Sequence, residues 1–235
     1  MKLVITHLTR MGYPRVCVAG IEPVSGRYIR PVTGREEPLT LDAVHSGLLR
    51  LGQVIELGPC RVGGRPPEVE DCWFSLGKAQ VVEQLSPKAF WSRLEASAQG
   101  SLAEVFGEGL RPHRTTLALP AGTGRASLGD LRVEGLRLRV EVHQNQASLR
   151  AHFRVSDCPD ELSVAVVDLR FYKAWGSCGY RLDVGKVNWV NRALRSSRAI
   201  LSVGLSRAKA LGSQEPLHWL QVNGVHLESD PLWAH

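Results

Sequence analysis

The stretch Leu136-Arg137-Leu138-Arg139-Val140-Glu141-Val142-His143 decides the fold class, because apolar and polar residues alternate along its whole length. Successive side chains of a β-strand point to opposite faces of a sheet, so this alternation predicts a half-buried strand. Four further strands are predicted after it, at Leu149–Val155, Leu162–Tyr172, Ile200–Leu205 and Trp219–Leu227. The near-continuous apolar run 162–169 predicts a strand that is buried on both faces. The second half of the chain is therefore expected to form a curved sheet.

The first half of the chain carries the same kind of pattern, with short β-prone runs between turn signals such as Gly12-Tyr13-Pro14 and Ser25-Gly26. The strands predicted there are Leu3–Leu8, Arg15–Ile21, Arg27–Val32, Gln53–Leu57 and Asp71–Leu76. No alternation of strands with long helices is present, so a parallel sheet built from strand–helix–strand units is not expected.

Two helix starts stand out after these strands. Ser86-Pro87 places a capping residue before a proline at the first helical position, and Phe90, Leu94 and Ala98 then recur on one face. The Ser101–Glu104 segment has the spacing of a capping box, and Gly107 ends the short helix that it starts. We expect this helical segment to cover the open end of a barrel.

These elements predict a mainly β fold with minor α, arranged as two OB-like Greek-key barrels in tandem. About five strands and one helix in each half are the element count of an OB-fold. We expect an N-terminal barrel over residues 1–115, with its helix near 86–107, and a C-terminal barrel over residues 116–235. An SH3-like barrel fits the element count nearly as well and stays open as an alternative.

The composition is that of a globular protein, with 43% hydrophobic and 22% charged residues. No apolar run approaches the roughly 20 residues that span a bilayer, and Met1–His7 is too short and interrupted for a signal peptide. We expect a cytoplasmic protein. The five cysteines are scattered and form no C-x-x-C pair, so neither a disulfide framework nor a structural zinc site is expected. We also expect no cofactor.

Several segments in this order and spacing resemble one prokaryotic group, the dual OB-domain proteins. The resemblance rests on Lys2–Met11, Val16–Ile21, Tyr28–Val32, Leu162–Tyr172 and Trp219–His226. It covers both halves of the chain, and it implies two OB-folds and a nucleic-acid-related role as an accessory subunit of a prokaryotic defence or nucleic-acid-processing complex. The matching residues are strand residues and turn glycines, which specify architecture rather than chemistry, and the resemblance supplies no catalytic motif.

Positive charge is concentrated in residues 170–209, which contain nine Arg and Lys residues and one Asp, a net charge of +8 against +6 for the whole chain. Aromatic residues are interleaved with these charges. Basic side chains that follow phosphates, with aromatic rings on which bases stack, build single-strand-binding grooves. The candidate nucleic-acid-binding residues are Arg170, Tyr172, Lys173, Trp175, Tyr180, Arg181, Lys186, Trp189, Arg192, Arg195, Arg198 and Arg207. The alternative is a solvated basic loop beside aromatic core residues.

A second, smaller patch is predicted in the first half. It consists of Arg15, Arg27, Tyr28 and Arg30, which lie on or beside neighbouring predicted strands. The type of nucleic acid, single-stranded DNA or RNA, is left open by both patches.

The chain shows no nucleophile elbow and no phosphate-binding loop, so we expect a non-catalytic binding protein. The acidic cluster Asp157, Asp160 and Glu161 is consistent with a metal-dependent nuclease, although a polar loop before a strand explains it more simply. Asp168 lies in an apolar run and is expected to pair with an arginine or a backbone donor. A scaffold that docks a partner enzyme through its barrels is the main alternative function.

Overall fold

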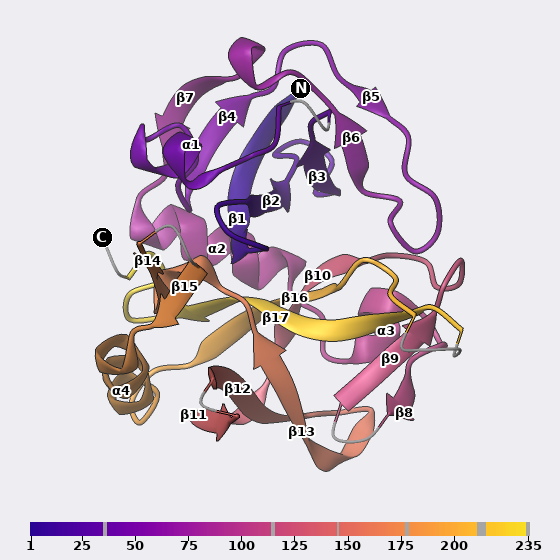
Figure 1. Ribbon diagram of the computed structural model, residues 1–235, viewed down its shortest axis with the longest axis vertical. Coiled ribbons are helices and arrows are strands. Elements are labelled where there is room, and N and C mark those ends of the chain that lie inside the picture. Colours follow the sequence, from indigo (N-terminus) through magenta and orange to yellow (C-terminus); the bar gives the residue numbers. More distant parts are fainter. Residues whose placement is uncertain (35–36, 114–115, 145, 177–178, 211–214, 234–235) are drawn as a thin grey trace.

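The computed structural model describes residues 1–34, 37–113, 116–144, 146–176, 179–210 and 215–233. The fold is mainly β, with two curled sheets that lie against each other (Figure 1). This confirms the predicted fold class. The strands of the first sheet come from residues 2–84 and those of the second from residues 111–227, and we call the two sheets the first and the second barrel. None of the helices in the described ranges is long and apolar enough to span a membrane.

The first barrel has seven strands in the order β5-β6-β3-β2-β1-β4-β7. Its elements are β1 (Lys2–Arg10), β2 (Val16–Ile21), β3 (Tyr28–Val32), α1 (Leu41–His45), β4 (Gln53–Glu56), β5 (Arg61–Val62), β6 (Asp71–Trp73), a 3₁₀ turn (Leu76–Lys78) and β7 (Gln80–Gln84). The β1–β2 register shifts between Ile5 and His7, next to Gly20. A Cβ at Gly20 would lie 1.9 Å from the Val4 carbonyl oxygen, so only glycine lets the strands approach at this bend.

Two helices link the barrels, α2 (Pro87–Ser97) and α3 (Leu102–Phe106). Both predicted starts are confirmed, since Ser86 accepts a hydrogen bond from the Ala89 amide and Ser101 forms a capping box with Glu104. The apolar face of α2 packs into the core of the first barrel, whereas α3 packs into that of the second. The core contacts therefore change barrel between residues 98 and 102. The division of the chain at 115/116 stays a prediction.

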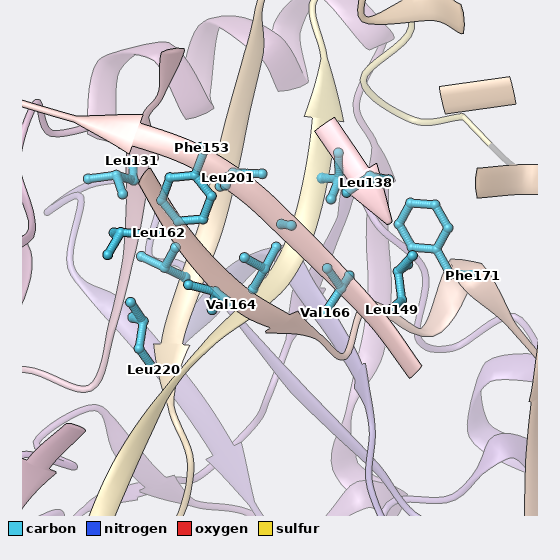
Figure 2. Packing of buried hydrophobic residues seen from close by; sticks show 14 of the residues in the cluster. Leu131, Leu138, Leu149, Phe153, Leu162, Val164, Val166, Phe171, Leu201 and Leu220 are labelled. Atoms are coloured by element: carbon cyan, nitrogen blue, oxygen red, sulfur yellow. The ribbon is translucent and has the colours of Figure 1, made fainter. Parts of the chain in front are cut away.

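The second sheet follows the order β10-β16-β17-β13-β12-β11, with β9 also paired to β17 and β8 to β9. Its strands are β8 (Arg111–His113), β9 (Thr116–Pro120), β10 (Leu128–Arg132), β11 (Glu134–His143), β12 (Gln146–Val155), β13 (Cys158–Val166), β16 (Ala199–Leu205) and β17 (Leu217–Leu227). Only Val133 separates β10 from β11, so the chain joins the two ends of the order and the sheet curls into a barrel. Figure 2 shows Leu131, Phe153, Leu162 and Leu201 in its core.

Both barrels share part of one topology. In each, three antiparallel strands are followed by a helix and then by further strands, one of which runs parallel to the third: β6 beside β3 in the first barrel and β17 beside β13 in the second. The helices are α1 in the first barrel and α4 (Val184–Ala193) in the second. This is the five-stranded Greek-key arrangement of an OB-fold.

The predicted strand Leu162–Tyr172 is wrong in its last part. β13 ends at Val166, Asp168 caps a 3₁₀ turn (Leu169–Phe171), and the chain returns as a hairpin of β14 (Tyr172–Trp175) and β15 (Gly179–Leu182). Burial within β13 alternates, so this strand is also not buried on both faces as predicted. Asp183 caps the helix that follows the hairpin, because its side chain accepts the Lys186 amide.

The contact between the barrels is a polar seam. Asp130 is fully buried and accepts hydrogen bonds from the hydroxyls of Tyr28 (2.8 Å), Ser97 (2.7 Å) and Ser202 (2.7 Å). Glu70, on the first barrel, accepts the amide and the hydroxyl of Ser127 at the start of β10. Buried carboxylates are tolerated because each is satisfied in this way.

Asp168 lies in the same seam and is 1% exposed. It forms an ion pair with Arg170 (2.7 Å) and accepts the Val225 amide (3.0 Å), so the expected pairing with an arginine and a backbone donor is confirmed. The Arg170 guanidinium also donates to the Val225 carbonyl oxygen and lies 4.1 Å from the ring centroid of Trp233. Arg170 is therefore part of the seam.

Candidate nucleic-acid interface

The β14–β15 hairpin forms one wall of a cleft of about 700 Å³, which we call the hairpin cleft. The opposite wall is formed by Gln146–Ser148 at the start of β12, and Arg10 comes from the end of β1. The hairpin supplies the aromatic side chains and the guanidinium of Arg181. No carboxylate is present among the described residues that line the cleft, so its charge is positive.

Trp175 presents the main aromatic surface of this cleft. Its side chain is 59% exposed, and the guanidinium carbon of Arg181 lies 4.6 Å from the centroid of its ring. The two residues are held together because Trp175 pairs with Gly179 at the end of the hairpin, two residues before Arg181. An exposed indole is a costly surface to leave in water, and a cation beside it adds a phosphate donor.

Tyr172 forms the floor of the cleft. Its ring is buried, its hydroxyl donates to the Val166 carbonyl oxygen (2.7 Å), and the Arg10 guanidinium lies 4.3 Å from its ring centroid. Burial raises the pKa of Tyr172, while Arg10 acts in the opposite direction. The Tyr172 phenol therefore stays protonated at neutral pH, and its fixed ring orients Arg10.

The hairpin is anchored to the first barrel through Tyr180. The Tyr180 hydroxyl donates to the Arg15 carbonyl oxygen (3.0 Å), and its ring packs edge-on against Tyr13 with centroids 5.5 Å apart. Tyr13 and Arg15 lie in the loop that joins β1 to β2. The cleft is thus positioned by both barrels, although its exposed residues come from the second.

A second hollow of about 540 Å³ lies on the other side of the hairpin, lined by Tyr172, Lys173, Tyr180, Lys186 and apolar residues of α1 and its flanking segments. Lys173 is exposed but forms an ion pair with Asp183 (2.7 Å), which lowers the pKa of that carboxyl. Burial lowers the pKa of Lys186, and the positive charges of Lys173 and Arg170 add to this effect against the attraction of Asp183. His45, Arg50 and Arg170 also line this hollow, so basic side chains are present on both sides of the hairpin.

The remaining candidates of the basic stretch lie away from the hairpin cleft. Arg198 pairs with Glu228 (2.6 Å) and Glu95 (3.2 Å) on another face of the molecule. Arg207 pairs with Asp71 (2.7 Å) across the seam. Three more residues are exposed on α4 or directly after it: Trp189, Arg192 and Arg195. Some residues of the basic stretch therefore meet at the hairpin cleft, and the others lie elsewhere on the molecule.

The four residues of the second patch do not form one surface. Arg15 is exposed beside the hairpin, and Arg27 is exposed at a separate cleft near Asp130. Tyr28 binds Asp130 through its hydroxyl, and burial raises its pKa. Arg30 is 4% exposed and donates to Asp71 (2.5 Å). Two of the four residues are thus part of the seam.

The acidic cluster before β13 has structural partners. Asp157 accepts hydrogen bonds from the Leu102 and Ala103 amides (3.1 and 2.9 Å) at the start of α3. Glu161 pairs with Arg137 (2.5 Å) and lies 3.5 Å from His152. Over the described ranges, no three His, Cys, Asp or Glu residues are grouped as metal ligands. We therefore derive no nuclease chemistry from this loop.

Arg10 and Gln146–Ser148 are cleft residues that the sequence analysis did not single out. Arg10 closes a strand of the other barrel, 162 positions before Tyr172, so only the fold brings it to the hairpin. Gln146–Ser148 follow the turn that joins β11 to β12. OB-folds bind oligonucleotides with this loop, so the topology itself was a usable signal.

Comparisons with known proteins give a weak structural likeness. No family model matches the chain, and no curated protein matches it. Among solved structures, the chain is similar to a protein in "Structure and Conformational Change of a Replication Protein A Heterotrimer Bound to ssDNA", with 10% identity and a TM-score of 0.34. The match covers 88% of this chain and 43% of the other, so the chain spans less than half the length of the protein that it resembles.

Proposed function

We propose that this protein is a non-catalytic nucleic-acid-binding protein that holds a single-stranded segment in the hairpin cleft. The observation that carries the proposal is the pairing of the exposed Trp175 with Arg181 at the rim of a cleft without carboxylates. A base stacks on the indole, and the phosphates on either side contact Arg181 and Arg10. Base stacking on an aromatic side chain is tolerant of sequence, so we expect little sequence preference.

The position of the cleft in the fold supports the same function. It lies beside the turn that joins β11 to β12, where OB-folds place one of their oligonucleotide-binding loops. Its walls come from both barrels, so a bound strand would lie across their junction.

A binding titration over a salt series tests the proposal directly. Fluorescence anisotropy with labelled single-stranded DNA and RNA of mixed sequence should show an affinity that falls as salt rises, with a slope of about −0.7 per phosphate contact in a plot of log K against log salt. The Trp175 emission should be quenched as binding saturates. The absence of binding to both polymers at low salt, or an affinity independent of salt, would refute the function.

The exposed edge strand β7 favours a second candidate function, the docking of a partner protein. All five residues of β7 are exposed, including Val81 and Val82, and the strand is the last of its sheet. An open edge is a template for strand addition by another chain. If a stoichiometric partner co-purifies after nuclease treatment and is lost in Val82→Lys, the scaffold function is supported.

The resemblance to dual OB-domain proteins completes the proposal with a biological setting. It is that of a cytoplasmic accessory subunit in a prokaryotic defence or nucleic-acid-processing complex. Affinity purification from the native host, with and without nuclease, distinguishes an association through nucleic acid from a direct protein complex. A protein that is recovered alone in both conditions would contradict this setting and leave the binding activity untouched.

A further inference from the structure

A cavity smaller than the two hollows at the hairpin lies in the seam between the barrels, and we call it the junction pocket. Its volume is about 90 Å³. The residues that matter here come from both barrels: His7, Arg10, Arg30, Arg207, Gln221 and Asn223. The pocket shares Arg10 with the hairpin cleft but none of the residues of the hairpin.

Two arginines present buried nitrogen donors at this pocket. Arg30 is 4% exposed, and its Nε donates to Asp71, but its Nη2 donates to no acceptor among the described residues. Arg10 Nε is likewise buried without an acceptor in the described part of the chain. A guanidinium has only donors, so both groups require an oxygen acceptor. Leaving a buried charged donor unsatisfied is costly.

The charge around the pocket favours an anion over a cation. Arg10, Arg30 and Arg207 carry three positive charges. Asp71 binds both Arg30 and Arg207, and Glu68 binds Arg207 (2.9 Å), whereas Arg10 has no ion-pair partner among the described residues. Burial lowers the pKa of His7, so its ring adds no charge at neutral pH.

The volume limits the size of the ligand. A volume of about 90 Å³ suits a small ligand such as a tetrahedral oxyanion. The amide side chains of Gln221 and Asn223 line the pocket together with the arginines.

We propose that the junction pocket binds a single phosphate group, held by Arg30 Nη2 and Arg10 Nε where the two barrels meet. The phosphate is either a free inorganic ion or the terminal phosphate of an oligonucleotide. In both cases the ligand lies between Arg10 and Arg30 of the first barrel and Gln221 and Asn223 of the second. This site lies apart from Trp175 but shares Arg10 with the hairpin cleft, and the binding of a free phosphate ion does not depend on the proposed function.

Isothermal titration with inorganic phosphate, at ionic strength matched with sodium chloride, tests the site. The native chain should bind one phosphate per molecule, and its melting temperature should rise with phosphate concentration as expected for a ligand of the folded state. Arg30→Gln and Arg10→Gln should each weaken binding at least about tenfold, which corresponds to about 1.4 kcal/mol. Arg61→Gln, on the exposed strand β5, is the control and should bind normally.

Arg30→Lys covers the case in which Arg30→Gln does not fold. Lysine keeps the charge opposite Asp71 but has no counterpart of Nη2, so this variant should fold and still lose phosphate binding. Phosphate binding that is absent from the native chain, or unchanged in a folded Arg30→Lys, overturns the proposal and leaves only ordered water in the pocket.

Terminally phosphorylated and unphosphorylated oligonucleotides identify the source of the phosphate. The phosphorylated strand binds more tightly than the unphosphorylated one if the ligand is the end of a nucleic acid. This preference should then disappear in Arg30→Lys and persist in Trp175→Ala. Equal affinities with preserved inorganic phosphate binding identify a free ion. If the native chain binds no oligonucleotide but still binds inorganic phosphate, only the proposed function is refuted.

Discussion

The two barrels share a core of three antiparallel strands with a parallel neighbour of the third, and they differ in what the chain inserts after that third strand. In the first barrel the described part of this connection contains the five-residue helix α1 and no strand. In the second barrel it contains a 3₁₀ turn, the β14–β15 hairpin and the ten-residue helix α4. The most exposed tryptophan of the second barrel and its arginine partner lie on this insertion. The scaffold is therefore common, and the candidate chemistry belongs to the insertion.

The largest expected effect comes from removing the ion pair at the root of the insertion. Asp168→Ala should lower the free energy of unfolding by about 3–5 kcal/mol, because it leaves Arg170 buried without its partner. Urea denaturation measures the change. Asp42→Ala, on the exposed face of α1 in the first barrel, is the matched control and should change stability by less than about 0.5 kcal/mol. Equal losses of stability in Asp168→Ala and Asp42→Ala would remove the contrast between the connections of the two barrels.

A tryptophan exchange compares the two barrels as binding surfaces. Trp175→Ala should weaken single-strand binding by about 1–3 kcal/mol, or roughly 5- to 150-fold, through the loss of one stacked base. Trp73→Ala removes the exposed tryptophan of the first barrel, which is 44% exposed, and should leave the affinity unchanged. Anisotropy titrations at one salt concentration compare them. A larger loss in Trp73→Ala would move the site to the other barrel.

The histidines of the seam should make the contact between the barrels sensitive to acid. Burial lowers the pKa of His226 well below its usual value, reinforced by Arg170 and His7, and burial also lowers that of His7. The unfolded chain binds protons at pH values below about 6.5 that the folded chain rejects. Stability should thus be complete above pH 7 and fall below it, by up to about 1.4 kcal/mol per pH unit for each histidine.

Melting temperatures between pH 7.5 and pH 5 measure this loss, with about 0.5-unit steps giving adequate sampling. His226→Gln should reduce the slope of stability against pH, even if the variant is less stable at neutral pH. A slope that is identical in this variant would assign the acid sensitivity to other groups.

The smallest expected effect is electrostatic. Arg181→Gln should weaken binding of single strands uniformly across sequences and reduce the magnitude of the salt slope by about one phosphate contact. Arg195→Gln, an exposed arginine after α4, is its control within the second barrel and should leave the slope unchanged. If Arg195→Gln has the larger effect, the bound strand follows α4 instead of the hairpin.

The sequence predicted the scaffold better than the insertion. Alternation at Leu136–His143 and the capping residues Ser86 and Ser101 are local signals, and the structure confirms both helix starts. The turn at Asp168 was not predicted, because its side chain is satisfied by Arg170 and by the distant Val225 amide. A run of apolar residues looks the same whether it continues as a strand or turns.

The candidate site shows the same limit. The basic, aromatic composition of residues 170–209 located the hairpin, but composition does not indicate which arginines have acidic partners. Arg207 pairs with Asp71 and Arg198 with Glu228, across 136 and 30 positions of the chain. Arg10 was missed because it reaches the cleft from the other barrel. Such partners depend on tertiary packing and leave no periodic trace in the sequence.

The position of Asp130 in the sequence determines when its hydrogen bonds can form during synthesis. It accepts the Tyr28 hydroxyl from a strand synthesised 102 residues earlier, and the Ser202 hydroxyl from one synthesised 72 residues later. At ribosomal rates of about 5–20 residues per second, the first half waits several seconds or more for its carboxylate partner. During that interval the nascent chain displays polar groups that the mature molecule conceals, so the first half reaches its final form only when the last strands emerge.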